Sequence, residues 1–242
     1  MNDKSEIIRS FSTNAEKDEN KLNIEKGLNH FNWNMRYPKA DKFDGLLMWW
    51  GTLQGPKSPP GDYTVRLISE NDSAEINFKI LQDPRMEGSV EDRIAQFNFL
   101  LDIRNKLDET HDAIRNMRNI KSQIKALNNR LNKDEFEEVI EEGKRLDSLM
   151  LEIEKVLYQT KLKSNQDMLN YPIRLNNKLA HVASLANMGL YKPTQQMLQV
   201  KEHITKKIDA ELIKWGQIKE NDLLKYNELL RVRKVNFVDV KE

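Results

Sequence analysis

The hydrophobic pattern of the chain changes its period once, near residue 85. Before that point apolar residues recur at every second position over short runs, which is typical of half-buried strands. After it they recur every three or four residues over long runs, which is typical of amphipathic helices. The sequence therefore predicts an α+β protein with a β domain over residues 1–85 and a helical domain over residues 86–242.

Three segments near the N-terminus have the pattern of strands. The clearest alternation lies in residues 27–37, where one side of the chain carries Phe31, Trp33, Met35 and Tyr37. A continuous apolar run covers residues 46–53, and a shorter one covers residues 7–12. Large apolar residues on one side of an alternating run indicate a strand that buries one face.

A hairpin is expected further along, where residues 63–68 and 75–81 alternate on either side of the polar turn at residues 70–73. Four or five short strands separated by Gly- and Pro-rich loops favour a small β-sandwich. Because the chain opens almost directly on the apolar run at residues 7–12, we expect this sandwich to lack its first strand, which would leave an unpaired edge.

The second part of the chain predicts a long helical hairpin. Ser89 and Asp92 have the spacing of a capping box, with Asp replacing the usual Glu or Gln. Helical spacing then continues over residues 90–131, breaks at the polar turn 132–134, and resumes over residues 136–163. The short turn predicts that the two helices run antiparallel.

Two further helices and a short extra segment complete the expected antiparallel four-helix bundle. Prolines at 172 and 193 mark the starts of the third and fourth helices, and residues 221–233 have the pattern of a short helix. The apolar spacing is interrupted by polar residues such as Arg104 and His111. These breaks favour an intramolecular bundle over a coiled-coil dimer.

Composition supports the division but gives no reaction. Residues 1–85 contain five of the nine Gly, five of the seven Pro and three of the four Trp, whereas both parts are nearly neutral. A net charge of +1 argues against nucleic-acid binding. The absence of cysteine excludes disulfides, Cys-based zinc sites and a Cys nucleophile. No apolar run is long enough for a membrane span, and residues 1–20 lack the apolar core of a signal peptide.

The order of several motifs resembles the region that follows the propeller in bacterial sortilin-like proteins, which are large exported proteins with BNR-type repeats, often labelled glycosyl hydrolases. The resemblance covers residues 25–240 and rests on GLNHFNWNMRYP (27–38), WWGTLQGPKSPPGDYTVRL (49–67), QDPR (82–85), YPIRLNNKLAHVASL (171–185) and KPTQQ (192–196). It implies that the predicted sandwich is immunoglobulin-like and that its opening strand precedes Ile7.

In that family the catalytic or ligand-binding part is the β-propeller, and this sequence has no repeat of propeller length. The resemblance therefore implies a non-catalytic accessory region that contacts a propeller, either one belonging to its own missing N-terminus or one on a separate chain. It also implies export to the periplasm, the cell surface or the medium. The alternatives are a carbohydrate-binding module, or part of a glycoside hydrolase whose active site lies in a missing propeller.

Trp49, Trp50 and Arg36 are the candidate contact residues. Two adjacent indoles offer faces on which a sugar ring or a partner could stack, but the alternative is packing in the core or against the helices. Arg36 lies at the end of an expected strand, where we expect it to pair with an acid across the domain junction, for example Asp83. In the third helix, Asn176 and Asn177 are unusual helix formers, and we expect them to contact the first domain.

No other residue pattern predicts a catalytic, cofactor or metal site. The four histidines, His30, His111, His181 and His203, lack zinc-binding spacing. The acidic run at residues 134–142 is expected to be a solvated helix start, because it has no calcium-loop pattern. Nucleophile-elbow and phosphate-binding glycine motifs are also missing from the sequence.

Overall fold

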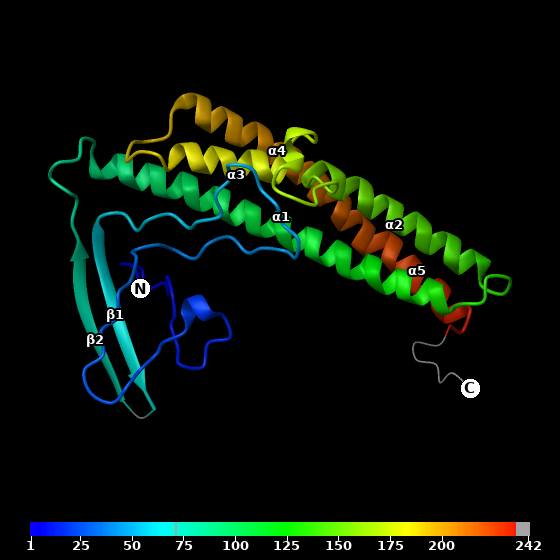
Figure 1. Ribbon diagram of the computed structural model, residues 1–242, viewed down its shortest axis with the longest axis horizontal. Helices are drawn as coiled ribbons and strands as arrows, with labels where there is room; N and C mark the ends of the chain where they lie inside the picture. The colour runs from blue at the N-terminus through cyan, green and yellow to red at the C-terminus, as the bar shows by residue number, and fades with distance from the viewer. Residues whose placement is uncertain (71, 236–242) are drawn as a thin grey trace.

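The computed structural model describes residues 1–70 and 72–235, which form an elongated helical body with a β-hairpin at one end (Figure 1). Helices make up most of the regular structure. In the described part of the chain they are α1 (Val90–Arg130), α2 (Glu137–Leu157), α3 (Leu175–Ala186), α4 (Gln195–Gln217) and α5 (Leu223–Val232), with short 3₁₀ turns at Asp18–Asn20 and Asp167–Leu169.

Helix α1 begins where the sequence predicts and runs along nearly the whole body (Figure 1). The Asp92 amide donates to Ser89 Oγ (3.2 Å), and the Ser89 amide donates to the Asp92 carboxylate (3.2 Å). This reciprocal capping box satisfies two amides that the first helical turn leaves free. Helix α2 packs back against α1, so these two helices form the expected antiparallel hairpin, although α2 ends six residues before the predicted limit.

Helices α4 and α5 form one continuous helical run, because a π-helical turn at Ile218–Asp222 joins them. The run starts at Thr194, whose side chain accepts a hydrogen bond from the Met197 amide (3.2 Å). It packs on α2 along much of its length and buries Trp215 and Tyr226. The short helix expected at residues 221–233 is therefore the last part of a longer one.

The only regular sheet in the described ranges is the hairpin of β1 (Gly61–Ser69) and β2 (Asp72–Ile80). The strands are antiparallel, with Tyr63 opposite Phe78 and Val65 opposite Ile76. The hairpin projects from the body near the start of α1 (Figure 1). At its base the Trp33 ring contacts those of Tyr63 and Phe78, with centroids 6.3 and 6.5 Å away.

The predicted β-sandwich is wrong. Residues 7–12, 27–37 and 46–53 contain no regular strand, and in this region only single bridges occur, Ser12 to Lys21 and Arg36 to Lys57. An immunoglobulin-like sandwich needs two packed sheets, whereas the described chain has one sheet of two strands. The apolar run at 46–53 fails to become a strand because its backbone hydrogen-bonds to helix α3 rather than to another strand.

The segment before β1 contributes to the helical core. Ala40 and Phe43 are buried to 0% and 4% exposure in the same cluster as the inward residues of α1, α2 and α3. The boundary placed after residue 85 stays a prediction. One hydrophobic core contains residues from both sides of this boundary, because Ala40 and Phe43 pack with side chains of the helices.

Candidate functional site

Residues 38–53, called the strap below, lie on the helical body. They form an extended segment that reverses direction, so that its two halves run side by side. The strap runs out along α1, turns, and returns, and the Ala40 amide donates to the Leu53 carbonyl across its two arms (2.8 Å). Figure 1 shows it running from the hairpin end along α1 and turning back near α3. Trp49 and Trp50, the sequence-predicted contact residues, lie on its returning side.

The first arm of the strap is held by polar side chains that share one face of α1. We call them the polar stripe of α1, and they follow one another at intervals of four and three residues, which keeps them in line on a helix. The bonds are Arg104 Nε to the Pro38 carbonyl (3.2 Å), the Asp41 amide to Asp108 Oδ1 (2.6 Å), His111 Nδ1 to the Asp41 carbonyl (2.7 Å), Arg115 to the Lys42 carbonyl (3.1 Å) and Arg118 to the Asp44 carbonyl (2.8 Å).

This stripe explains the interruptions in the apolar spacing of α1. Arg104 and His111, which break the hydrophobic repeat, supply hydrogen-bonding groups to a backbone that has no strand partner. A buried peptide group without a partner costs free energy, so the helix must offer polar atoms wherever the strap lies. A polar stripe at helical spacing inside an apolar face is therefore a sequence signal for a backbone segment that lies on the helix, in addition to being evidence against a coiled coil.

His111 is completely buried in this contact. Its Nδ1 lies 2.7 Å from the Asp41 carbonyl, and its Nε2 lies 3.4 Å from Asn176 Nδ2. We assign the proton to Nδ1, which then donates to Asp41 while Nε2 accepts from Asn176. Burial lowers the pKa of His111, because the interior disfavours the charged imidazolium. His181 bonds elsewhere, to the Trp50 carbonyl, so the two histidines form no shared site.

Phe43 anchors the turn of the strap. Its ring is 4.9 Å from the ring of Tyr158, and the Arg118 guanidinium stacks 4.5 Å from its centroid. Arg118 is fixed in turn by an ion pair with Glu154, whose side chain is almost fully buried (2.7 Å). Aromatic, cationic and anionic groups from the strap, α1 and the end of α2 thus hold the turn of the strap in place.

The second arm is held by Asn177 of α3, which acts as a substitute for a neighbouring strand. The Trp49 amide donates to Asn177 Oδ1 (2.7 Å), and Asn177 Nδ2 donates to the Trp49 carbonyl (2.8 Å). The next carbonyl, of Trp50, accepts from Ser184 Oγ (2.8 Å). The expected contact with the N-terminal part is confirmed for Asn177, whereas Asn176 bonds to His111 of α1 (3.4 Å).

With the backbone fixed in this way, the two indole side chains remain partly exposed to solvent. Trp49 is 38% exposed and Trp50 is 69% exposed, and their ring centroids are 6.4 Å apart with 30° between the planes. Trp50 has a φ of 54°, a conformation that is unfavourable for a bulky residue. At Gly51 an added Cβ would come within 2.9 Å of the Ala180 Cβ, so the strap closely approaches α3. The contacts with α3 therefore hold the backbone at Trp50 in an unfavourable conformation.

Arg36 lies apart from this pair. It is half-buried, and its guanidinium donates to the Gly55 carbonyl (2.9 Å). The expected pairing with Asp83 is not formed, because Asp83 binds Arg85 instead (2.7 Å). Gly55 has no room for a side chain, since an added Cβ would lie 2.1 Å from the Tyr37 carbonyl. Arg36 thus fastens the loop that returns from the strap.

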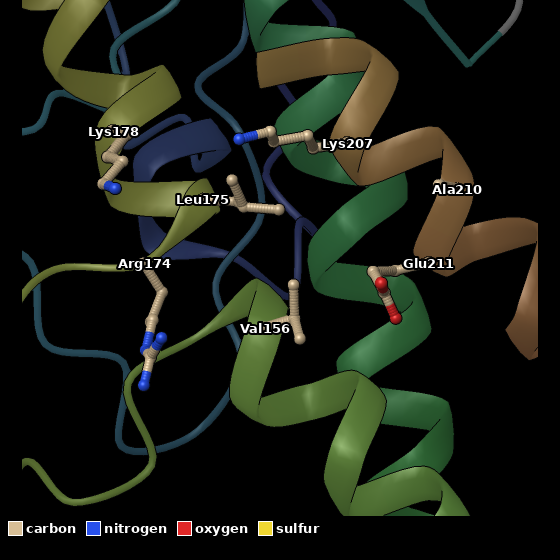
Figure 2. Close-up of a pocket in the computed structure, with 7 residues that line it drawn as sticks. All are labelled: Val156, Arg174, Leu175, Lys178, Lys207, Ala210 and Glu211. Carbon is tan, nitrogen blue, oxygen red and sulfur yellow. The ribbon is translucent and has the colours of Figure 1, made fainter. Parts of the chain in front are cut away.

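A separate open cleft of about 310 Å³ lies between the end of α2, the start of α3 and the middle of α4 (Figure 2). Lys207 extends from α4 across the gap toward Leu175, whereas Lys178 lies on α3 and Arg174 on the segment that leads into it (Figure 2). Glu211 belongs to a pair with Lys214 (2.7 Å). Sequence reasoning did not identify this cleft, because its residues come from three distant segments without a shared motif.

The remaining histidines and carboxylates of the described residues form no metal-binding cluster. Within residues 1–70 and 72–235, no group of three or more His, Asp or Glu is arranged to hold a metal ion. His30 contacts Asn32, and His203 is exposed. Over the same part of the chain, no helix is both long enough and apolar enough to pass through a membrane.

Comparison with protein-family models, with curated proteins and with solved structures finds no match to this chain.

Proposed function

We propose that this chain is a non-catalytic accessory module of an exported, sortilin-like propeller protein, and that it works by contacting the propeller. The resemblance of its motifs suggests the partner and the location outside the cytoplasm. The glycosyl-hydrolase label of those relatives belongs to the propeller, so no residue of this chain is assigned a catalytic role.

One observation carries the proposal of a contact role. Trp49 and Trp50 are exposed, yet their backbone is fixed by Asn177 and Ser184 of α3. Tryptophans are enriched among the residues that dominate binding energy at protein interfaces. A rigid backbone lowers the entropy lost when such residues are immobilised by a partner. The Trp pair is therefore a preorganised contact surface.

The test is binding of the full chain to a separately expressed propeller domain of a sortilin-like protein, measured by biolayer interferometry. Trp50→Ala should weaken binding by at least about tenfold, the effect typical of a central aromatic contact. Tyr191→Ala is the matched control, because Tyr191 is also an exposed aromatic residue (60%). No binding by the unaltered chain, or equal loss in both variants, would contradict the proposal.

Carbohydrate binding is the second candidate, and the geometry of the same pair favours it. The two indole planes differ by only 30°, and the polar side chains of His181 and Ser184 lie beside them, bonded to the Trp50 carbonyl. Sugar rings stack on such faces through their C–H groups. Plant and bacterial glycans should then change the tryptophan fluorescence of the chain, and Trp49→Phe with Trp50→Phe should remove the change. An unchanged spectrum across the glycans would exclude this candidate.

A further inference from the structure

The outer edge of strand β2 is an open hydrogen-bonding surface. The direction of the backbone groups follows from Thr64. Its amide donates to the Met1 carbonyl (3.1 Å), and its carbonyl accepts from the Met1 amino group (2.8 Å). The backbone amide and carbonyl of Thr64 therefore point away from β2. Asn77 lies opposite Thr64, and its amide and carbonyl point away from β1, because two residues that face each other in an antiparallel pair share one bonding type. By the same alternation, Glu75 and Lys79 also direct their peptide groups outward.

These peptide groups have no hydrogen-bonding partner within residues 1–70 and 72–235. The Ser73 amide, nearer the turn, is satisfied by the Asp72 carboxylate (2.8 Å). Beyond it, every second residue directs its amide and carbonyl outward. We call these groups of Glu75, Asn77 and Lys79 the open edge of β2. On β1, by contrast, Met1 occupies the equivalent position at Thr64. Figure 1 shows β2 as the strand farther from the N-terminal segments.

The same hairpin has an uncovered apolar face. Val65, Leu67 and Ile76 lie on one side of the sheet and are 55%, 65% and 70% exposed. Trp33 covers only the base of this face, at Tyr63 and Phe78. A two-stranded hairpin is marginally stable by itself, and natural edge strands are normally guarded by charge, proline or cover. This edge has one lysine, Lys79, and no proline.

We propose that the open edge of β2 binds one extended strand of a partner protein, which extends the sheet to three strands. The strand would carry apolar residues beside Ala74, Ile76 and Phe78, and polar residues beside Glu75, Asn77 and Lys79, because side chains alternate between the faces of a sheet. Main-chain hydrogen bonds supply affinity in this binding mode, and alternate side chains supply specificity.

A single partner strand fits this surface better than a second copy of the chain packed face to face on the hairpin. A stable interface between folded proteins uses about 20–30 residues on each side. The exposed apolar face of the hairpin offers far fewer, so face-to-face packing of two copies would bury too little. An added strand needs only the existing edge and continues the ladder already present between β1 and β2. This site goes beyond the proposed contact at Trp49 and Trp50, because it involves neither residue.

Two proline variants separate the two edges. Glu75→Pro removes an outward amide from β2, and Arg66→Pro removes one from β1, while both leave the β1–β2 ladder intact. Arg66 and Glu75 lie opposite each other and form an ion pair, so each variant loses the same pair. Far-UV circular dichroism should show unchanged helix content in both.

The probe is a fluorescein-labelled peptide with the sequence of β1, GDYTVRLIS, which has the required alternation. Fluorescence anisotropy should show saturable binding to the full chain. Glu75→Pro should weaken it by about tenfold, and Arg66→Pro by less than about twofold. Trp50→Ala should leave it unchanged.

Three outcomes would overturn the inference. The peptide shows no saturable binding, or both proline variants weaken it equally. Alternatively, the chain forms a dimer that Glu75→Pro, but not Arg66→Pro, returns to monomer in sedimentation. That last result would assign the edge to a second copy instead of a partner strand.

Discussion

The strap and the β1–β2 hairpin are both short apolar segments within the first 85 residues, but they satisfy their peptide groups in different ways. Most of the strap's hydrogen bonds are to side chains of α1 and α3, such as His111 and Asn177. The hairpin bonds to itself, strand against strand. An apolar run therefore has no fixed structure of its own, because the nearest available donors and acceptors decide which structure it takes.

The two segments also differ in what they bury. Phe43 of the strap is 4% exposed and belongs to the core, whereas Ile76 of the hairpin is 70% exposed. Substitutions in the strap should therefore reduce the stability of the whole helical body, and substitutions on the hairpin face should hardly change it. Four measurements of unfolding free energy test this difference.

The largest effect is expected for Phe43→Ala. Removing this buried ring leaves a cavity beside Tyr158 and Arg118 and should cost about 4 kcal/mol. Urea unfolding followed by circular dichroism measures the loss. Lys42→Ala is the control, since its side chain is exposed and only its carbonyl is bonded. A cost below about 1 kcal/mol would show that the strap is not part of the core.

A smaller loss is expected for Asn177→Ala. It leaves the Trp49 amide and carbonyl without their side-chain partner, which should cost about 2 kcal/mol. Tryptophan emission should shift to longer wavelength as the second arm of the strap loosens. Lys178→Ala, at the next position of the same helix, should change neither measurement. An unchanged emission spectrum in Asn177→Ala would mean that α3 does not hold the pair.

Acid should weaken the strap contact through His111. Its pKa is lowered from 6.5 in the folded protein by burial, so unfolding takes up a proton in the range between the folded and unfolded values. Stability is therefore complete above about pH 6.5 and decreases as the pH falls toward the folded pKa, by at most about 1.4 kcal/mol per pH unit. Asp108 and Asp112 oppose this lowering of the pKa, and Arg115 adds to it.

The measurement is the unfolding free energy from about pH 7 to about pH 5. His111→Gln should flatten the curve in this range, and the same substitution at the exposed His203 should leave it unchanged. Parallel curves for the unaltered chain and His111→Gln would refute the assignment of the pH dependence to this group.

The smallest effect is expected on the hairpin face. Ile76→Thr replaces an exposed apolar side chain with a strand-forming polar one and should change the unfolding free energy by less than about 0.5 kcal/mol. It should also reduce aggregation at high concentration, measured by light scattering. A destabilisation above about 1 kcal/mol would show that this face is covered in solution.

Local rules predicted the helices and the hairpin well. The capping box at Ser89 and the proline before Thr194 placed two helix starts, because caps act within one turn of the chain. The alternation around the turn at residues 70–73 placed the hairpin, because its strands are neighbours in sequence. The same alternation failed at residues 27–37, where no strand lies alongside to complete a ladder.

The candidate site was predicted only in part. Trp49 and Trp50 could be chosen because adjacent tryptophans are conspicuous, and Asn177 because asparagine is a poor helix former. The pairing of Arg36 with Asp83 was wrong, since Arg85 lies much nearer to Asp83 along the chain and binds it. The open edge of β2 depends on which residues face outward, and a sequence does not fix that without a known register.

The sequence by itself determined the change from short alternating runs to long helical periods, the starts of α1 and α4, the hairpin, and the exclusion of cysteine chemistry. The tertiary structure decided that the strap lies on α1 and α3 instead of in a sandwich, that His111 is buried, and that the Trp pair is exposed. The division has a physical reason. Periodicity and capping act between residues close in sequence, whereas the partner of a peptide group or an aromatic ring is found only when distant segments meet.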